Sequence, residues 1–402
     1  MIAPTQPNER ILIVDVLRGF ALFGILLVNI GNFSQPDFYT DTAGINLSTG
    51  TYDVVAQWFV SLFAQGKFYP MFSFLFGFGA IIFLERGEEK GQNAVRLYKR
   101  RLGFLLCIGI VHAVLIWSGD ILVMYSLIGF LLLWFRRKEP RVILTWALWL
   151  LLTPIAVLIF LNILFVFAVG GQSDPGLAAE AEKLVEESLA AYGQGTYLDM
   201  IRQRLRDLSY LYSYSLFAFP DILALFLFGV YAAKKRILHD VVSHLVLITR
   251  VWKSTLFLGV ILIAIHAVGE AGRDLATPSM YDVLSLVSLL SGSVLSFFYM
   301  SSIALLLQKP KGRVLLSKLA PVGRMAMTNY LMQSVVCTTL FYNYGLGLYG
   351  KMTPFYTLLI AILLYVLQMA ISSYWMARHR YGPMELLWRR LTYGKRLEVG
   401  RQ

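Results

Sequence analysis

The main pattern along the chain is a series of long apolar runs separated by charged segments. A helix that crosses the hydrocarbon core of a bilayer needs about 20 predominantly apolar residues. Ten runs fit this pattern, and they predict an all-α, polytopic membrane protein that forms a single integral membrane domain over residues 1–402. The ten predicted transmembrane helices cover residues 11–30, 68–85, 101–117, 120–135, 141–169, 214–233, 251–270, 281–307, 324–342 and 354–377.

The charged residues give these spans an orientation. With an even number of spans, the segments on the side of the N-terminus hold 29 of the 36 Lys and Arg residues but only 9 of the 24 Asp and Glu residues. Segments on the cytoplasmic side of membrane proteins carry an excess of Lys and Arg. The sequence therefore predicts that both termini are cytoplasmic.

Composition excludes an ordinary soluble domain, because 57% of the residues are apolar and only 15% are charged, against about a quarter in soluble proteins. The net charge of +12 follows the membrane topology, so we expect no nucleic-acid partner. Cys107 and Cys337 both lie in predicted spans, without the spacing of metal ligands, and no metal site is expected. No nucleotide-binding glycine loop is present, which gives no support to ATP-driven transport.

The outer loop, residues 170–213, has the pattern of two short helices. Asp174-Pro175 offers a helix start, Gly193 a stop, and Thr196 a second cap with Asp199 three residues later. The second helix has an apolar face, which predicts packing against an apolar surface, either as a lid over the outer mouth or as a simple connection between spans. The residues of this face are Ile201, Leu205, Leu208 and Tyr212.

The basic tail, residues 378–402, starts a helix at Pro383 and combines Trp388 with Arg389 and Arg390. Aromatic and basic residues on one short helix are typical of a segment that lies on anionic lipid headgroups. We therefore expect the tail to contact the membrane surface.

Polar residues within apolar spans are costly, at roughly 2.5–3.5 kcal/mol for a charged side chain on insertion scales, so each needs a partner or a task. Asp15 and Arg18 lie three residues apart on one helical face, where they can pair or extend to the interface. Asn29 shares a face with Arg18, so a polar stripe runs along the first span. The stripe can line a tunnel or bind a neighbouring helix.

The segment from His112 to Leu122 carries the strongest chemical signal. Gly119 interrupts the apolar run, Trp117 precedes it, and Asp120 can cap the next helix. A carboxylate beside His112 would orient the imidazole as a general base, although the distance between them is marginal for direct contact and a satisfied core histidine is the alternative. Two weaker candidates are the pair His266 and Glu270, for acid-base or proton-relay chemistry, and Lys67 beside aromatic residues at the outer mouth, for attracting anions.

Five segments together resemble the YeiB-like family of bacterial inner-membrane proteins, a family described only as a domain of unknown function. The segments run from Asp15 to Asn29, from Gly66 to Gly79, from His112 to Leu122, from Gly323 to Ser334 with Asn329 and Gln333, and from Tyr381 to Lys395. They occur in order over nearly the whole chain, and the resemblance implies a multi-pass protein of the bacterial inner membrane in contact with its lipids.

The first span is also similar to that of two groups of membrane acyltransferases, the heparan-glucosaminide N-acetyltransferases and the bacterial O-acyltransferases of surface glycans. The shared pattern is Asp15, Arg18 and Gly19. This similarity implies transfer of an acyl group from cytoplasmic acyl-CoA to a hydroxyl or amine, such as that of a glycan, on the outer side. The chain departs from both groups, because Asn29 occupies the place of the histidine of the O-acyltransferases, and residues 31–66 contain no histidine.

We therefore assign the general base to His112 with Asp120, by inference and not by the resemblance. In this interpretation the CoA phosphates are bound by Arg18, Arg96, Lys99, Arg100 and Arg101, and the substrates contact Asp15, Arg18, Asn29, Lys67, Trp117, Asn329 and Gln333. The alternatives are a transporter of a small polar or anionic solute, with the ionisable pairs as relays, and a non-catalytic scaffold.

Overall fold

The computed structural model describes residues 11–43, 45, 50–169, 175–271 and 278–394. The regular structure in these ranges is helical, without strands, which confirms the predicted all-α class. The helices are α1 (Leu12–Ser34), α2 (Asp37–Ala43), α3 (Thr51–Phe63), α4 (Phe68–Glu89), α5 (Ala94–Val111), α6 (Leu122–Phe135), α7 (Pro140–Val169), α8 (Pro175–Gly193), α9 (Tyr197–Lys234), α10 (Leu245–Ala271), α11 (Pro278–Leu306), α12 (Pro310–Leu316), α13 (Ala320–Arg324), α14 (Ala326–Phe341), α15 (Pro354–Arg378) and α16 (Pro383–Tyr393).

Several helices are suited to a bilayer. Among the described residues, five segments are long and apolar enough to cross a membrane: Leu12–Ser34, Thr51–Glu89, Pro140–Leu161, Leu245–Gly269 and Pro354–Arg378. Leu290–Leu306 and Pro310–Arg324 give a sixth if this pair, bent by 119°, is one broken span. A multi-pass membrane protein is thus supported, whereas the number of ten spans and the cytoplasmic location of both termini stay predictions.

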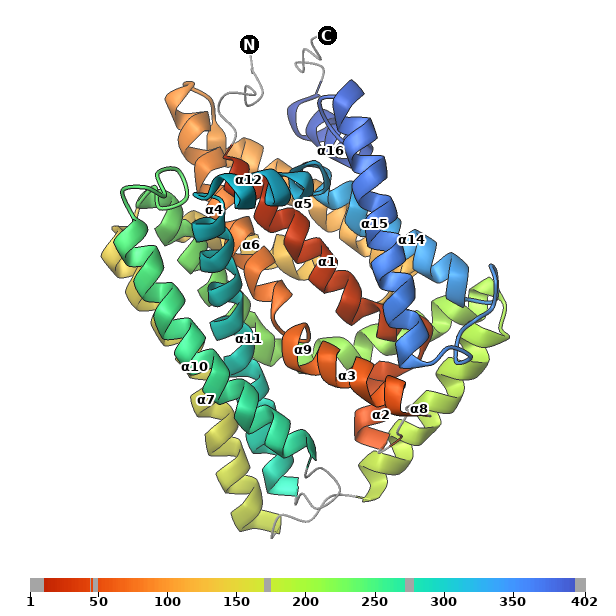
Figure 1. The fold of residues 1–402 in the computed structure, drawn as a ribbon. Coiled ribbons are helices and arrows are strands. Elements are labelled where there is room, and N and C mark those ends of the chain that lie inside the picture. The colour runs from red at the N-terminus through yellow and green to blue at the C-terminus, as the bar shows by residue number, and fades with distance from the viewer. Residues whose placement is uncertain (1–10, 44, 46–49, 170–174, 272–277, 395–402) are drawn as a thin grey trace.

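Helix α1 runs through the middle of the bundle and packs against α4, α13, α14 and α15 (Figure 1). Glycines allow the closest of these contacts. A Cβ on Gly323 of α13 would overlap the carbonyl oxygen of Asp15, and one on Gly19 of α1 would overlap that of Leu319. The backbones therefore touch, as small residues permit between membrane helices, and this contact fixes the start of α1 beside Arg324.

A second close crossing joins α4 to α9. Gly77 faces the carbonyl oxygen of Phe226, and Gly229 faces that of Phe74, so neither position has room for a Cβ. The reciprocal pattern brings two long helices into backbone contact.

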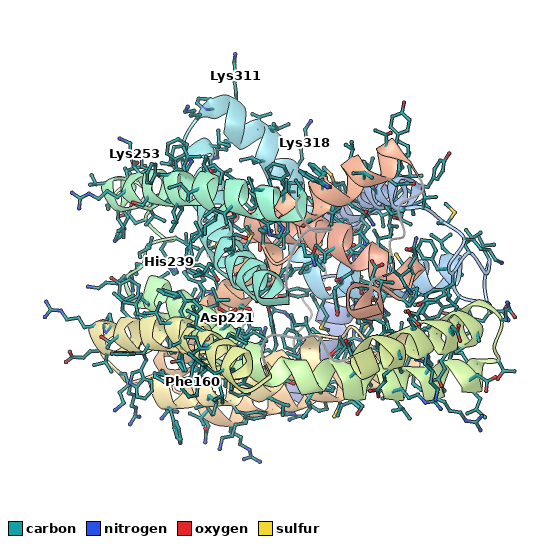
Figure 2. The ribbon with its side chains drawn as sticks, turned by 90° about the horizontal axis from the view of Figure 1, so that it is seen from below. Phe160, Asp221, His239, Lys253, Lys311 and Lys318 are labelled. Carbon is teal, nitrogen blue, oxygen red and sulfur yellow. The ribbon has the colours of Figure 1, made fainter. Side chains whose placement is uncertain are left out.

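The side chains separate into a lipid-like exterior and a polar interior. Phe160 of α7 is 64% exposed and lies at the periphery in Figure 2. Asp221 of α9 is 2% exposed, lies within the bundle, and accepts a hydrogen bond of 2.9 Å from the hydroxyl of Tyr69. Apolar side chains outside and paired polar side chains inside are what a bilayer environment requires.

The outer loop differs from its prediction at one end. Helix α8 ends at Gly193, and Thr196 and Asp199 form the expected capping box at the start of α9. Asp174, the first predicted cap, lies outside the described residues. The second short helix does not stop, because α9 continues for 38 residues from Tyr197 to Lys234 and includes the predicted span 214–233. Helix α9 therefore connects the outer segment rigidly to the bundle.

Candidate functional site

The chain between α5 and α6 forms a π-helical turn, His112–Ile116. The backbone N–H of Trp117 donates to the carbonyl of His112 at 2.8 Å and closes the turn. Trp117 then becomes extended, and its ring packs 4.1 Å from the ring of Phe33. Gly119 is required here because a Cβ would overlap the Trp117 ring. Single π-helical turns occur frequently at functional sites.

The turn brings His112 and Asp120 into direct contact, with 2.7 Å between Nδ1 and Oδ2. Their side chains are only 1% and 0% exposed. The other carboxylate oxygen, Oδ1, accepts the backbone N–H of Val123 at 2.9 Å, so Asp120 also caps α6. The two roles weighed for Asp120 from the sequence, helix cap and histidine partner, are thus both present in the structure.

This contact determines the tautomer of His112. An ionised carboxylate only accepts hydrogen bonds, so Nδ1 carries the proton and Nε2 carries the lone pair. Nε2 is buried and has no hydrogen-bond partner among the described residues, and neither has the indole N–H of Trp117. Buried polar atoms are nearly always paired in native proteins, so two exceptions beside one another indicate a place for a polar ligand. The arrangement provides a nitrogen that can accept a proton and an indole N–H on two rings whose centroids are 6.4 Å apart.

Above the π-turn, α9 presents a buried polar face. Asp207 is 2% exposed and accepts hydrogen bonds from Tyr39 at 2.6 Å, Gln203 at 2.9 Å, Ser118 at 3.4 Å, and from Tyr192. Burial raises the pKa of Asp207, while these four hydrogen bonds oppose the shift. The cluster ties α2, α8 and α9 to the segment that follows the π-turn.

This polar face corrects the predicted orientation of the outer helix. Leu205 is 51% exposed and Tyr212 is 38% exposed, whereas Gln203 and Arg204 are buried. The apolar face was expected to pack against the protein, but the structure buries the polar face instead. Ile201 and Leu208 of the predicted apolar face are half-buried, so the apolar face is only partly covered by the protein.

Tyr39→Phe tests the Asp207 cluster. The substitution removes one donor to a buried carboxylate and changes little else, so we expect a loss of about 1–3 kcal/mol in the free energy of unfolding. The measurement is the unfolding midpoint of the purified protein in detergent. Tyr52→Phe, at a position 75% exposed, is the matched control and should leave the midpoint unchanged. Equal midpoints for both variants would contradict the assignment.

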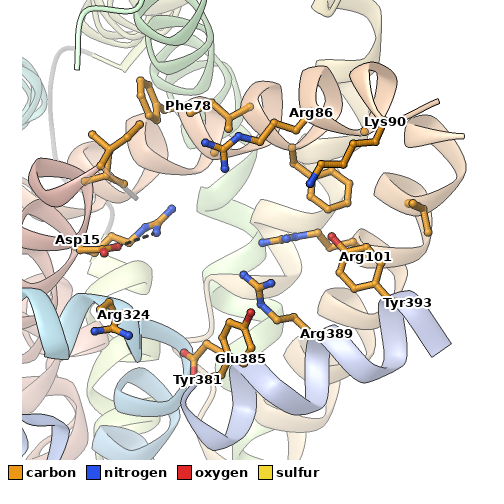
Figure 3. A pocket seen from close by; sticks show the side chains of 18 of the residues that line it. Asp15, Phe78, Arg86, Lys90, Arg101, Arg324, Tyr381, Glu385, Arg389 and Tyr393 are labelled. Carbon is orange, nitrogen blue, oxygen red and sulfur yellow. Dashed lines mark ion pairs between the residues drawn. The ribbon is translucent and has the colours of Figure 1, made fainter. Parts of the chain in front are cut away.

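At the other end of α5 lies a basic pocket of about 260 Å³ (Figure 3). Its walls come from α1, α4, α5, α13 and α16, and the side chains of several of these helices converge on it. The charged lining residues are Arg18, Arg86, Lys90, Arg101, Arg324 and Arg389, with Asp15 and Glu385 as the two carboxylates. Arg18 and Asp15 form the predicted ion pair, at 3.6 Å. The excess of positive charge makes this pocket suited to a polyanion.

Helix α16 forms one wall of the basic pocket, while contact of the tail with the membrane surface stays a prediction. The ring of Trp388 stacks 3.9 Å from the guanidinium of Arg101, and its indole N–H donates to the Arg101 carbonyl at 2.9 Å. Glu385 accepts the backbone N–H groups of Met327 at 2.7 Å and Thr328 at 3.0 Å. It thereby caps α14. The indole N–H of Trp388 and the carboxylate of Glu385 thus both have hydrogen-bond partners within the protein.

The structure places some predicted residues outside both sites. Arg96, Lys99 and Arg100 are exposed on α5, and they do not line the basic pocket. Asn29 is half-buried on α1 and does not line the pocket, whereas Asp15 and Arg18 of the same span do. Lys67 is 1% exposed, and its ammonium donates to the Ser61 carbonyl at 2.7 Å.

Asn329 and Gln333 both join a buried hydrogen-bond network between α14 and α15. The amide nitrogen of Asn329 is 2.9 Å from Ser372, and that of Gln333 is 2.9 Å from Gln368. Such bonds hold membrane helices together, so the structure gives these two residues packing contacts.

His266 lies 2.9 Å from the hydroxyl of Ser61, while the side chain of its predicted partner Glu270 lies outside the described residues. Within the described ranges, no group of three His, Cys, Asp or Glu side chains is arranged to hold a metal ion.

Sequence reasoning missed Arg86, Lys90, Arg324 and Arg389 as pocket residues, and Arg204 and Asp207 as buried polar residues. The basic residues of the pocket come from separate segments of the sequence, and the excess of Lys and Arg expected in cytoplasmic segments already accounts for each of them. For Asp207 a signal was present, because Gln203 and Asp207 recur at helical spacing on the side away from the apolar face, whereas Arg204 lies at the edge of that face.

Comparisons with known proteins agree on one family. Residues 232–395 match a family model described as "Protein of unknown function (DUF418)". The chain is 38% identical over 405 residues to the uncharacterised protein YxaH of Bacillus subtilis, covering 97% of this chain and 96% of the relative. It is 29% identical to the uncharacterised protein YeiB of Escherichia coli, covering 96% of each chain. It is also 29% identical to an uncharacterised 39.9 kDa protein from the amylase 3' region of Bacillus acidopullulyticus, covering 98% and 97%.

Proposed function

The chain belongs to the DUF418 family of proteins of unknown function, which includes relatives such as YxaH and YeiB, and we propose that it is a membrane acyltransferase. The resemblance to the YeiB-like family is confirmed by these comparisons, and the proposed activity goes beyond them. The enzyme would take an acyl group from cytoplasmic acyl-CoA and transfer it to a hydroxyl or amine on the outer side of the membrane.

The observation that carries this proposal is the free Nε2 of His112. The carboxylate of Asp120 holds the imidazole in the tautomer that accepts a proton at Nε2, and Val123 holds the carboxylate. A general base needs this combination of a fixed orientation and an available lone pair. Capping of α6 alone would require Asp120 and would not require a buried histidine beside it.

The reaction follows from this geometry. Nε2 of His112 removes the proton of the acceptor hydroxyl or amine while the acceptor atom attacks the thioester carbonyl carbon. Asp120 stabilises the imidazolium that forms. The C–S bond then breaks, the acyl group stays on the acceptor, and the imidazolium returns its proton to the leaving thiolate of CoA. No oxidant or further reactant is needed.

The basic pocket is suited to the phosphate end of acyl-CoA, the proposed donor. Acyl-CoA carries its phosphates at one end and its thioester at the end of a long flexible arm. Arg101 lines the pocket and His112 follows the last residue of the same helix, eleven residues later, which corresponds to about 16 Å at 1.5 Å per residue. Helix α5 therefore separates a polyanion site from a base by a distance that an extended arm can bridge.

Titration of the detergent-purified protein with acetyl-CoA tests the donor site. Arg101→Gln removes a cation of the pocket, so we expect binding at least tenfold weaker, because charge-assisted contacts to phosphate are strong. Dephospho-CoA should also bind more weakly to the wild type. Arg313→Gln, at an exposed position on α12 outside the pocket, is the control and should bind as the wild type does.

Absence of acetyl-CoA binding to the folded protein would contradict the proposal. The same cations would then favour the alternative, a transporter of small anions, and uptake into proteoliposomes would be the measurement. Weakening in Lys99→Gln but not in Arg101→Gln would place the phosphates on the exposed face of α5, as expected from the sequence, and not in the pocket.

A further inference from the structure

Arg204 of α9 is a fully buried cation that forms no ion pair among the described residues. Its side chain is 0% exposed. Nη1 donates to the backbone carbonyl of Leu115 at 2.9 Å and lies 3.4 Å from that of Val114. Nε and Nη2 have no hydrogen-bond partner within the described part of the chain. Three of its five N–H donors are therefore free.

Such an arrangement is unfavourable unless an anion completes it. A buried charge costs several kcal/mol without a partner of opposite charge, and neutral carbonyl groups satisfy hydrogen bonds without cancelling the charge. Asp207 lies one turn further along α9, but its two oxygens already accept four hydrogen bonds from other residues. The protein thus provides a cation and leaves its counter-ion to come from elsewhere.

The free donors have the geometry of an oxyanion site. Nε and Nη2 lie on the same edge of the planar guanidinium, the edge that binds a carboxylate or a phosphate through two parallel hydrogen bonds. The rings of Tyr197 and Tyr342 lie 5.3 and 5.6 Å from the guanidinium carbon and hold it in place. The Tyr197 hydroxyl shares the Leu115 carbonyl with Nη1, at 2.6 Å.

The site adjoins the catalytic turn. Val114 and Leu115, whose carbonyls Arg204 binds, belong to the π-turn that begins at His112. The indole N–H of Trp117, which follows this turn, is also buried without a hydrogen-bond partner among the described residues. An anion on Arg204 would consequently lie at the π-turn that begins with the histidine we assign as the base.

We propose that Arg204 binds the acceptor substrate through an oxyanion, so that the acceptor carries a carboxylate or a phosphate in addition to the hydroxyl or amine that reacts. This inference rests on the proposed acyl transfer, because only that reaction makes the bound molecule an acceptor. The anion site itself is tested without acyl-CoA, so the two proposals fail separately.

The test is calorimetric titration of the purified full-length protein, without CoA, with three small probes, and the Arg101→Gln variant is titrated in parallel to detect anions that bind the basic pocket instead. Glycerate carries a carboxylate, glycerol 3-phosphate a phosphate, and glycerol neither. We expect one or both anions to bind and glycerol not to bind. Whichever anion binds identifies the chemistry of the acceptor. Equal binding of all three probes, or binding of none, would overturn the proposal.

Variants locate the site. Arg204→Gln keeps a donor for the Leu115 carbonyl but loses the charge and the fork, that is, the pair of parallel donors Nε and Nη2. Anion binding should therefore weaken at least tenfold. Arg204→Lys keeps the charge without the fork, and should bind more weakly than wild type while preserving the fold. Arg202→Gln, at a side chain 67% exposed on the same helix, is the matched control and should bind normally. Normal anion binding in both Arg204 variants would overturn the assignment.

Discussion

Replacement of His112 by glutamine is expected to lower the rate of acyl transfer by about 10²–10⁴-fold, the usual contribution of a general base. Glutamine can still donate a hydrogen bond to the carboxylate of Asp120, so the buried pair keeps a contact and the fold should persist. It has no basic nitrogen in place of Nε2. The measurement is release of CoA thiol from acetyl-CoA by proteoliposomes, with water as the default acceptor.

Two further variants make the result specific. Asp120→Asn can keep the cap on Val123 through its carbonyl oxygen, but its amide then faces Nδ1 and favours the tautomer with a proton on Nε2. It should therefore lose activity together with His112→Gln. His244→Gln, at a residue whose Nδ1 is 2.8 Å from a backbone carbonyl of its own turn, should retain full activity. Turnover within tenfold of wild type in His112→Gln would contradict the proposed mechanism.

The second large effect is expected from Gly323→Ala at the crossing of α1 and α13. The added Cβ would overlap the carbonyl oxygen of Asp15. Because two backbones are in contact there, no side chain can move aside, and overpacking costs typically about 1–3 kcal/mol and occasionally more. Separation of the two helices would also move Arg324 away from Arg18. We expect a lower unfolding midpoint and weaker binding of acetyl-CoA.

Gly103→Ala is the control for this prediction, because a Cβ at Gly103 of α5 would meet nothing within 4 Å. Alanine is the better helix former, so this variant should be neutral or slightly more stable. If Gly323→Ala matched it in both measurements, the close backbone contact would be contradicted.

The pair of His112 and Asp120 shows which part of the candidate site could be predicted from the sequence. The presence of His112 and Asp120 in one apolar segment was sufficient to select them, because ionisable residues are rare there. Their direct contact could not be predicted, since it depends on a π-turn that moves His112 relative to a regular helix. A π-turn has no reliable sequence pattern, and the marginal distance inferred from ordinary helical spacing was wrong.

Most of the basic pocket could not be predicted from the sequence. Arg18 and Arg101 were selected from the sequence, but Arg86, Lys90, Arg324 and Arg389 were not. A positive residue near the cytoplasmic end of a span is explained by orientation alone, so single positions carry no information about a ligand. Only their convergence from five helices distinguishes a site from a topological signal.

The outer part of α9 was misread for a physical reason. In a soluble protein, an apolar stripe marks the face that packs on the core. Here the exposed face of α9 carries Leu205 together with the exposed Arg202 and Arg206, whereas Arg204 and Asp207 find their hydrogen-bond partners inside the protein. The polar stripe, and not the apolar one, is therefore the better guide to the contacts of such a helix.

The basic pocket takes its walls from both ends of the described chain, since α1 and α16 are the first and the last helix (Figure 1). During synthesis the N-terminal helix enters the membrane long before the C-terminal helix leaves the ribosome. A nascent chain therefore lacks one wall of the basic pocket until Pro383–Tyr393 has been synthesised. A chain that ends before Pro383 would also leave the backbone N–H groups of Met327 and Thr328 without the Glu385 carboxylate, so premature termination removes a wall of the pocket and the cap of α14 together.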